Sequence, residues 1–507
     1  MERGTNRRLS FGRLLDLVER AGNRLPHPFM IFVYLALAVI LLSWIASLFG
    51  VTVTDPGTDE EVAIQNLLSG EGLAYILTSM VGNFVEFPAF GIVLALLLGI
   101  GLAQKAGLID ALMRRIIVGA PPRLVTYAVI FAGIIGSWAS DAATIIIPPL
   151  AGLAFLSMGR HPIAGIAIGF AAVSAGFNAN LLVAGTDALL AGISTEAAQS
   201  VQEGLTVSPV DNLYFINFSV IFLVVVGAFV SEKIVEPRLG TYRGGVEREM
   251  EEVTDTEKRG LRNALLATFG YVAALVAVTY PQGSPLRGEG GSLVDSPLFE
   301  AIVPILLLFF AFVGIVYGIT VGTIRRSADV PELMGEAVKD LSGLIVLFFA
   351  ASQFIAYFEE SNLSTLVAVY GARILEGANL TGLVAMIAFI PLVALINLFI
   401  VGGSSQWALM SPIFIPLFLL LDFDPAYTQL AFRIGDSSTN ILTPVNPFVP
   451  MILAFMREYD PRAGFGTLFS LMLPFSIFFL VGWTALFAIW SLLGLPIGPG
   501  TGMRMGG

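Results

Sequence analysis

The sequence predicts an all-α polytopic membrane protein with nine transmembrane helices, two re-entrant hairpins of opposite orientation, and an inverted repeat whose broken helices meet at the midplane. Two observations support this fold class. The 507 residues are 56% hydrophobic, with a mean hydropathy of +0.83, which is typical of a chain that crosses a membrane many times. Matching polar interruptions also occur in both halves, at residues 136–144 and 178–187 and at residues 402–407 and 435–447. Helices broken at membrane depth are tolerated only inside protein or beside a wet cavity, so duplicated breaks are typical of a transporter's binding site.

The N-terminal segment, residues 1–28, is basic and is expected to lie in the cytoplasm. The apolar run over 29–49 is long enough to cross a bilayer, so it is predicted to be the first transmembrane helix and not a cleavable signal. An acidic loop without Lys or Arg follows, as expected outside the membrane. A second span over about 85–112 then returns to a basic segment.

The next apolar segment, residues 124–158, is interrupted at 136–144 and has basic residues at both ends. Each half is too short to span alone, which favours a re-entrant hairpin that enters and leaves on the cytoplasmic side. One long helix that carries a few small polar residues is the alternative. A broken helix over 163–194 and a span over 213–235 complete the first half of the chain, residues 29–235.

The charged segment 236–262 is predicted to be the longest cytoplasmic loop. The second half, residues 263–496, begins with three expected spans. By apolar length and flanking charge they cover residues 263–281, 299–322 and about 342–374.

The second hairpin, residues 381–421, is followed by acidic residues and no Lys or Arg, so it is expected to enter from outside. A broken helix over 426–456 and a last span over 464–494 follow, which places the tail, residues 497–507, outside. The unit of hairpin and broken helix thus occurs once in each half with opposite orientation. This arrangement predicts a multi-pass protein of the cell's inner membrane built on inverted repeats.

Hydroxyl, amide and carboxylate oxygens gather at both sets of breaks, and such oxygens suit a hard cation such as Na⁺. An isolated Ser or Thr in a span usually bonds its own helix, so it is the clustering and duplication that favour a site. The first predicted cage is made of Ser137, Ser140, Asp141, Thr144, Asn178 and Asn180, and its counterpart of Ser404, Ser405, Ser437, Thr439 and Asn440.

Ionisable groups inside a membrane are costly and indicate function. Arg433 and Asp436 lie three residues apart on one helix face, so they could form a structural ion pair; alternatively, Arg433 clamps a substrate carboxylate. Asp187 is either part of the site or wetted surface near the outer end of its span. Trp407, beside a hairpin tip, is either an aromatic wall for a substrate ring or an interfacial belt residue, and its distance from the aqueous edge favours the wall.

Several classes are excluded or disfavoured. The chain has no cysteine, which excludes disulfides, thiolate metal sites and a catalytic cysteine, and it has no Walker A motif that would indicate ATP drive. His27 and His161 both lie at basic edges, which argues against a serine–histidine dyad in the membrane. The protein is therefore expected to be a transporter without a cofactor, coupled to Na⁺ or to protons carried by Asp141, Asp187 and Asp436, with no nucleic-acid partner.

Long motifs across the chain resemble the AbgT family of p-aminobenzoyl-glutamate transporters. They are GNRLPHP at 22–28, AGTD at 184–187, SPVDNLYF at 208–215, EPRLG at 236–240, GGSSQWAL at 402–409 and RIGDSSTNILTP at 433–444. The resemblance implies a homodimer of nine-span protomers in the lipid bilayer. It also implies a substrate path through Asp187, Trp407, Arg433 and Pro444, to which the residue pattern adds Asn178, Ser404, Ser405 and Asp436.

The expected function is ion-coupled transport of a small aromatic carboxylate of the p-aminobenzoyl-glutamate type, with sulfonamide antimetabolite efflux as in other members that the chain resembles. Two alternatives stay open from the sequence. One is a Na⁺-coupled symporter of dicarboxylates or short-chain organic acids. The other is an intramembrane aspartyl hydrolase that uses Asp187 and Asp436, although the GxGD motif of one such class is absent because position 433 is Arg.

Overall fold

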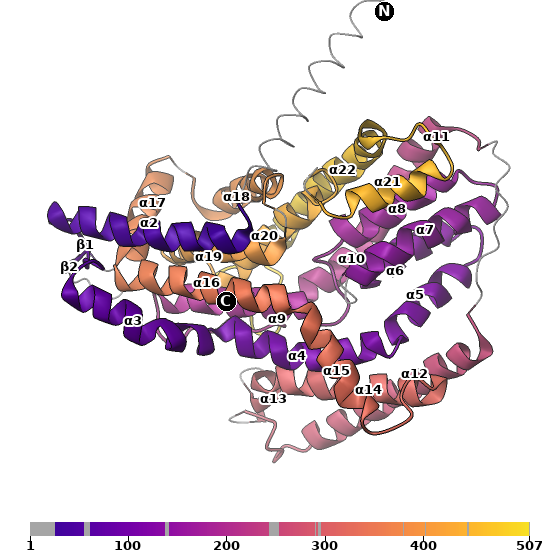
Figure 1. The fold of residues 1–507 in the computed structure, drawn as a ribbon, viewed down its shortest axis with the longest axis horizontal. Coiled ribbons are helices and arrows are strands. Elements are labelled where there is room, and N and C mark those ends of the chain that lie inside the picture. The colour runs from indigo at the N-terminus through magenta and orange to yellow at the C-terminus, as the bar shows by residue number, and fades with distance from the viewer. Residues whose placement is uncertain are drawn as a thin grey trace, which may run out of the picture.

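The computed structural model describes residues 26–54, 61–136, 141–242, 253–288, 291–292, 296–378, 380–400, 402–443 and 446–505, with only the backbone of residues 141 and 142. Helices build this part of the chain (Figure 1). Within it, seven helices are long and apolar enough to cross a membrane, or eight if one bent pair counts as a single span. The polytopic helical class is thus confirmed, whereas the nine spans, the opposed hairpins and the inverted repeat stay predictions.

The first half of the chain places its helices largely where apolar periodicity predicts them. Its elements are α2 (Pro28–Leu48), β1 (Thr52–Thr54), β2 (Glu61–Ala63), α3 (Gly70–Val85), α4 (Pro88–Lys105), α5 (Leu108–Val118), α6 (Val125–Gly136), α7 (Asp141–Ser157), α8 (Pro162–Ala175), α9 (Gly185–Gln199), α10 (Leu213–Val230), the π-helical turn η2 (Ser231–Val235) and α11 (Glu236–Leu239). The two strands pair antiparallel.

The second half is also helical throughout its described part. Its elements are α12 (Asp255–Thr279), α13 (Pro297–Glu300), α14 (Ile302–Val321), α15 (Asp329–Asp340), α16 (Ser342–Glu360), α17 (Leu363–Gly377), α18 (Gly382–Asn397), α19 (Gly403–Leu419), α20 (Pro425–Thr439), α21 (Val449–Arg457) and α22 (Phe465–Leu492).

Two predicted spans are wrong in their extent because a residue in the left-handed region ends the helix inside an apolar run. The span expected over 85–112 ends at Lys105, since Gly107 has φ 90° and caps the start of the separate helix α5. The span expected over 342–374 ends at Glu360, since Asn362 has φ 61° and α17 follows as a separate helix.

Three helices form where the sequence predicted loops. Before the second span, α3 begins at a Ser69 cap whose hydroxyl accepts a hydrogen bond from Gly72 N at 3.0 Å. Inside the expected cytoplasmic loop, α12 begins early because Thr254 and Glu257 form a reciprocal capping box. The amphipathic α15, which packs on α4, lies between two expected spans.

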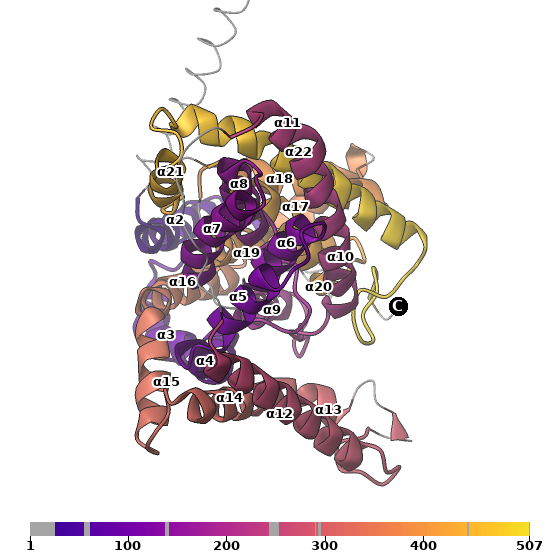
Figure 2. The ribbon, with the colours of Figure 1, turned by 90° about the vertical axis from the view of Figure 1, so that its right-hand side faces the viewer.

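The helices form two groups. In one, α12 packs against α14 and α14 packs against α4, and Figure 2 shows α12 and α14 projecting below the bundle that contains α6, α7, α8, α10 and α22. Small residues allow this close packing, because a Cβ at Gly99 would lie 2.4 Å from the Leu307 carbonyl oxygen. In the bundle, α6 and α7 contact each other and both pack on α8, as the two arms of a hairpin would.

The C-terminal tail folds back over the starts of α10 and α20. The Ile497 carbonyl accepts hydrogen bonds from the amides of Tyr214 at 2.9 Å and Phe215 at 3.2 Å, and Asp424 N donates to the Met503 carbonyl at 3.2 Å. Burial under the tail raises the pKa of Asp211, in the loop before α10, to about 7. That carboxyl therefore holds a proton far more readily than an exposed aspartate does.

Candidate functional site

Both predicted broken helices are broken in the structure. The first ends as α8 at Ala175 and resumes as α9 at Gly185, and the second ends as α20 at Thr439 and resumes as α21 at Val449. Unwound backbone inside a membrane protein needs side-chain partners for its polar groups. Hydrogen bonds between the two breaks satisfy these polar groups and join the breaks into one polar region.

Asn178, in the first break, connects the two halves of the chain. Its backbone N–H donates to the Ser437 hydroxyl at 3.2 Å. Its side-chain amide donates to the Asp436 carboxylate at 2.9 Å and to the Arg433 carbonyl at 3.3 Å. The two predicted oxygen clusters are therefore in direct contact through this residue and are not two independent cages.

A buried ion pair joins Arg433 on α20 to Asp187 on α9. The exposed fraction is 0% for the arginine side chain and 1% for the aspartate, so the interpretation of Asp187 as wetted surface is wrong. The alternative in which Arg433 pairs with Asp436 is also not found, since the guanidinium binds Asp187 on α9 and Asp436 instead accepts from Asn178.

The local sequence explains why Asp187 is held so firmly. It is the third residue of α9, where a carboxylate reaches back to unpaired amides and meets the positive end of the helix dipole. One of its oxygens accepts from Ala184 N at 2.6 Å, and the amide of Asn180 donates to the same oxygen at 3.2 Å. The carboxylate is thus well supplied with donors.

The Arg433 guanidinium is less completely paired. Its Nη2 binds Asp187, whereas Nε and Nη1 are buried and have no hydrogen-bond partner within the described residues. A guanidinium presents its donors in a planar fork that suits a carboxylate. The unpartnered Nε and Nη1 of Arg433 are therefore candidate anchors for an anionic group.

Asp436 has one engaged and one unengaged oxygen. Oδ2 accepts from Asn178, and Oδ1 is buried without a partner in the part of the chain described. The first turn of α19 reaches this carboxylate, because a Cβ added at Gly403 would lie 2.8 Å from Oδ2. Only glycine fits there, and the positive end of α19 favours the negative charge.

The end of α20 is held by Asn397, which sequence reasoning missed. Its amide donates to the Asp436 carbonyl at 2.6 Å, to the Thr439 hydroxyl at 3.0 Å and to Asn440 Oδ1 at 3.0 Å. The sequence did carry one signal for this residue, an amide side chain at the end of an apolar run and just before the break at Gly402. Thr439 and Asn440, predicted as Na⁺ ligands, are therefore engaged in packing α18 against the broken helix.

Trp407 on α19 is fully buried, which excludes the interfacial belt interpretation. The centroid of its ring lies 4.5 Å from the ring centroid of Phe432, which is the residue before Arg433. Its indole N–H donates to the Ser194 hydroxyl at 2.9 Å, which in turn donates to Gln429 at 2.7 Å. Ser194 and Gln429 were not predicted, because single polar residues in a helix carry no distinctive pattern.

The remaining predicted residues are only partly described. Ser137, Ser140 and Pro444 lie outside the described residues, and the side chain of Asp141 does too. Thr144 is buried on α7, and Ser404 and Ser405 lie in the first turn of α19 near Gly403. No group of three His, Asp or Glu residues in the described part could hold a metal ion.

We expect the substitution Arg433→Leu to lower stability by about 3–5 kcal/mol, because it leaves the buried Asp187 carboxylate unpaired. Adding Asp187→Asn should recover more than half of the loss, since it removes the charge and keeps an acceptor for Ala184 N. Adding Asp436→Asn instead should recover little. Thermal unfolding of the purified variants in one detergent, with the exposed Arg373→Leu as control, measures the differences. Equal stability of the two double variants would contradict this pairing.

Comparison with known proteins identifies the family of the chain. Residues 13–505 match the model of the AbgT putative transporter family. The chain is 43% identical over 495 residues to the p-aminobenzoyl-glutamate transport protein of Escherichia coli (strain K12), covering 97% of both chains.

Two solved transporters share the fold. The crystal structure of the Alcanivorax borkumensis YdaH transporter matches with a TM-score of 0.89 and 38% identity, over 94% of this chain and all of that one. Neisseria gonorrhoeae MtrF, described as illuminating a class of antimetabolite efflux pumps, matches with a TM-score of 0.91 and 40% identity, over 96% of this chain and all of that one. The chain is therefore a multi-pass membrane protein that belongs to the AbgT putative transporter family.

Proposed function

We propose that this protein is an ion-coupled secondary transporter, in the inner membrane, of aromatic carboxylates of the p-aminobenzoyl-glutamate type and of sulfonamide antimetabolites. The observation that carries the proposal is the fully buried Arg433, whose Nη2 is paired with Asp187 and whose Nε and Nη1 have no hydrogen-bond partner among the described residues. The names of the Escherichia coli and Neisseria gonorrhoeae relatives supply the substrate class.

A substrate carboxylate would accept a hydrogen bond from Nε or from Nη1 of Arg433 while Asp187 keeps Nη2. Such a contact is strong because donor and acceptor are both charged. Trp407 on α19 packs against Phe432, the residue before Arg433 on α20, and this pair of rings would pack against the benzoyl ring. Arg433 would thereby select for the anionic end and the two aromatic residues for the ring.

The coupling ion would act at Asp436. Its Oδ1 is a buried carboxylate oxygen with no donor in the described residues, and a proton or a Na⁺ ion there would neutralise the charge. Asn178 would connect ion and substrate, because it binds both Asp436 and the Arg433 carbonyl. Each half of the inverted repeat would consist of a hairpin and a broken helix, and the two halves would move past each other. This movement would carry the ion and the substrate across the membrane.

The intramembrane hydrolase alternative fits the geometry poorly. An aspartyl dyad needs two carboxylates that share a proton at close range. Here Asp187 is paired with Arg433 and Asp436 with Asn178, and no hydrogen bond joins the two aspartates in the described structure. Transport is therefore the function that these contacts favour.

We expect proteoliposomes to accumulate labelled p-aminobenzoyl-glutamate only under an imposed ion gradient. Arg433→Lys should reduce uptake about tenfold or more, because a lysine lacks the planar fork, whereas Arg373→Lys on the exposed face of α17 should not. Separate Na⁺ and pH gradients identify the coupling ion, and Asp436→Asn should abolish the dependence on it. Uptake of succinate but not of the aromatic compound would replace this proposal with the dicarboxylate alternative.

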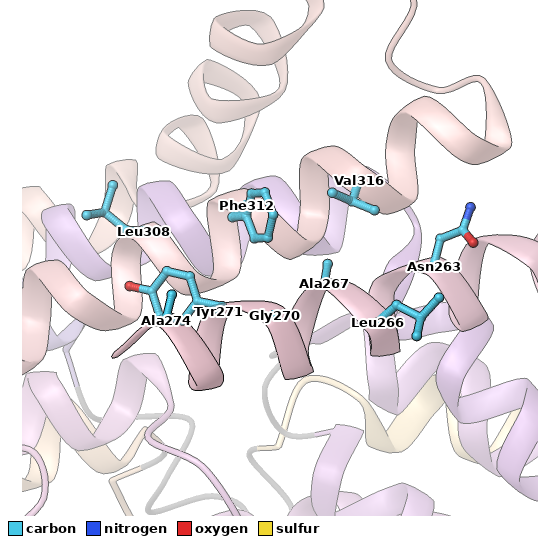
Figure 3. Close-up of a pocket in the computed structure, with 9 residues that line it drawn as sticks. All are labelled: Asn263, Leu266, Ala267, Gly270, Tyr271, Ala274, Leu308, Phe312 and Val316. Atoms are coloured by element: carbon cyan, nitrogen blue, oxygen red, sulfur yellow. The ribbon is translucent and has the colours of Figure 1, made fainter. Parts of the chain in front are cut away.

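We also propose that the protein is a homodimer whose second copy covers α12 and α14. These helices form a cavity of about 770 Å³ with an open face, shown in Figure 3. Only Gly260, Ala264 and Thr279 of α12 are buried, and Gly270 and Ala274 form a small-xxx-small pair on this face, a pattern that lets transmembrane helices approach closely. Asn263 and Tyr271 on the same face donate to the Thr320 hydroxyl at 3.1 Å and the Ile305 carbonyl at 2.7 Å, so they hold α12 on α14 and do not depend on a partner helix.

The cysteine-free chain makes this interface easy to test. A single cysteine at Ala274 should form a disulfide-linked dimer in membranes on mild oxidation, whereas one at Phe478, exposed on α22, should not. Gly270→Leu should weaken the dimer, because the added side chain blocks close approach of a partner helix. Equal cross-linking at positions 274 and 478 would argue against this face.

A further inference from the structure

A second cavity lies between α5, α12 and α14, on the side of α12 away from the proposed dimer face. Its volume is about 560 Å³, within the range typical of sites for small molecules. Its walls are mainly apolar, and they include Leu112, Leu182, Leu261, Leu265, Phe309 and Val313. None of these residues takes part in the Arg433 site.

The rim of the cavity is basic at one end. Arg115, Lys258 and Arg262 line it there, near the end of α5 and the start of α12. Lys258 is paired with Asp255 at 3.1 Å, but Arg115 and Arg262 are exposed and have no ion pair with any described residue. Two guanidinium groups that have no ion pair among the described residues, beside an apolar cavity, suit a ligand with an anionic head and an apolar body.

The dimensions fit a lipid of one leaflet. Along α12 the lining residues run from Lys258 to Thr268, a rise of about 15 Å at roughly 1.5 Å per residue. This is about half of the ~30 Å hydrocarbon thickness of a bilayer. The basic end lies on the face that Lys and Arg distribution predicts to be cytoplasmic. Leu265, in the wall, is 55% exposed, so the cavity opens toward the bilayer.

The transported solute fits this cavity less well. A p-aminobenzoyl-glutamate molecule would place its amide and its aromatic amine among carbon atoms, which is costly without hydrogen bonds. Thr268 is the one uncharged polar side chain among the lining residues, and its hydroxyl already donates to the Ala264 carbonyl at 3.0 Å. An acyl chain has no such requirement.

We propose that this cavity binds an anionic phospholipid of the cytoplasmic leaflet. Its phosphate would lie on Arg115 and Arg262, and an acyl chain would extend between α12 and α14 toward Leu182. Leu182 belongs to the break between α8 and α9, so the lipid would fill the space between the α12–α14 pair and the broken helix. The inference does not depend on which solute the protein carries.

Native mass spectrometry of the delipidated full-length protein, titrated with phosphatidylglycerol and separately with phosphatidylcholine, tests the proposal. We expect phosphatidylglycerol to bind at least about tenfold more tightly than phosphatidylcholine. Arg115→Gln/Arg262→Gln should remove that preference. The matched control Arg123→Gln/Arg462→Gln changes the same charge at exposed arginines elsewhere and should keep it. Leu112→Trp, which fills the cavity and leaves the arginines in place, should weaken binding of both lipids.

Three results would overturn the proposal. They are equal binding of the two lipids by the unmodified protein, an undiminished preference in the Arg115/Arg262 variant, and displacement of phosphatidylglycerol by p-aminobenzoyl-glutamate, which would assign the cavity to the solute. Because no transport is measured, a failure here is distinct from a failure of the proposed function. Thermal unfolding of each variant in the same detergent confirms that the compared proteins are folded.

Discussion

The buried ion pair between Arg433 and Asp187 is the interaction on which the rest of the site depends. A charge without water is tolerated only when it is paired and hydrogen-bonded, so each partner constrains what surrounds it. Asp187 supports the start of α9 and Arg433 extends from α20, and the pair therefore ties the broken helix of one half to that of the other. Asn178 and Asn397 then satisfy the unwound ends around it. Loss of the pair would loosen both breaks at once.

Close backbone contact makes this polar region possible inside an apolar protein. A Cβ at Gly435 would lie 2.5 Å from the Ile390 carbonyl oxygen, and one at Gly192 would lie 2.4 Å from the α-carbon of Ala89. Glycine at these positions lets α20 approach α18 and lets α9 approach α4, without the voids that larger side chains would force. Gly403 does the same for α19 and Asp436. The site thus lies where helices are closely packed, and its charged side chains are buried.

Much of this could be predicted from the sequence, because apolar length and duplicated Gly, Asn and Pro breaks are strong local signals. Both broken helices lie where those signals placed them, and Asn178, Asp187, Trp407, Arg433 and Asp436 are brought together. The identity of the partners could not be predicted. Spacing allowed a pair between Arg433 and Asp436, whereas the pair found, with Asp187, joins residues 246 apart. Asn397, Ser194 and Gln429 were missed for the same reason, since a tertiary contact leaves no periodic trace. Helix ends at Gly107 and Asn362 were hidden inside apolar runs.

The central claim is that Arg433 holds Asp187 on one side and a substrate carboxylate on the other. The most direct measurement is a structure of the protein with p-aminobenzoyl-glutamate bound, at a resolution that places side chains. The account predicts a glutamate carboxylate oxygen at about 2.7–3.0 Å from Arg433 Nε or Nη1, with the pair to Asp187 intact and the benzoyl ring against Trp407. A bound solute whose carboxylates do not contact Arg433, with Nε and Nη1 surrounded by protein alone, would contradict it.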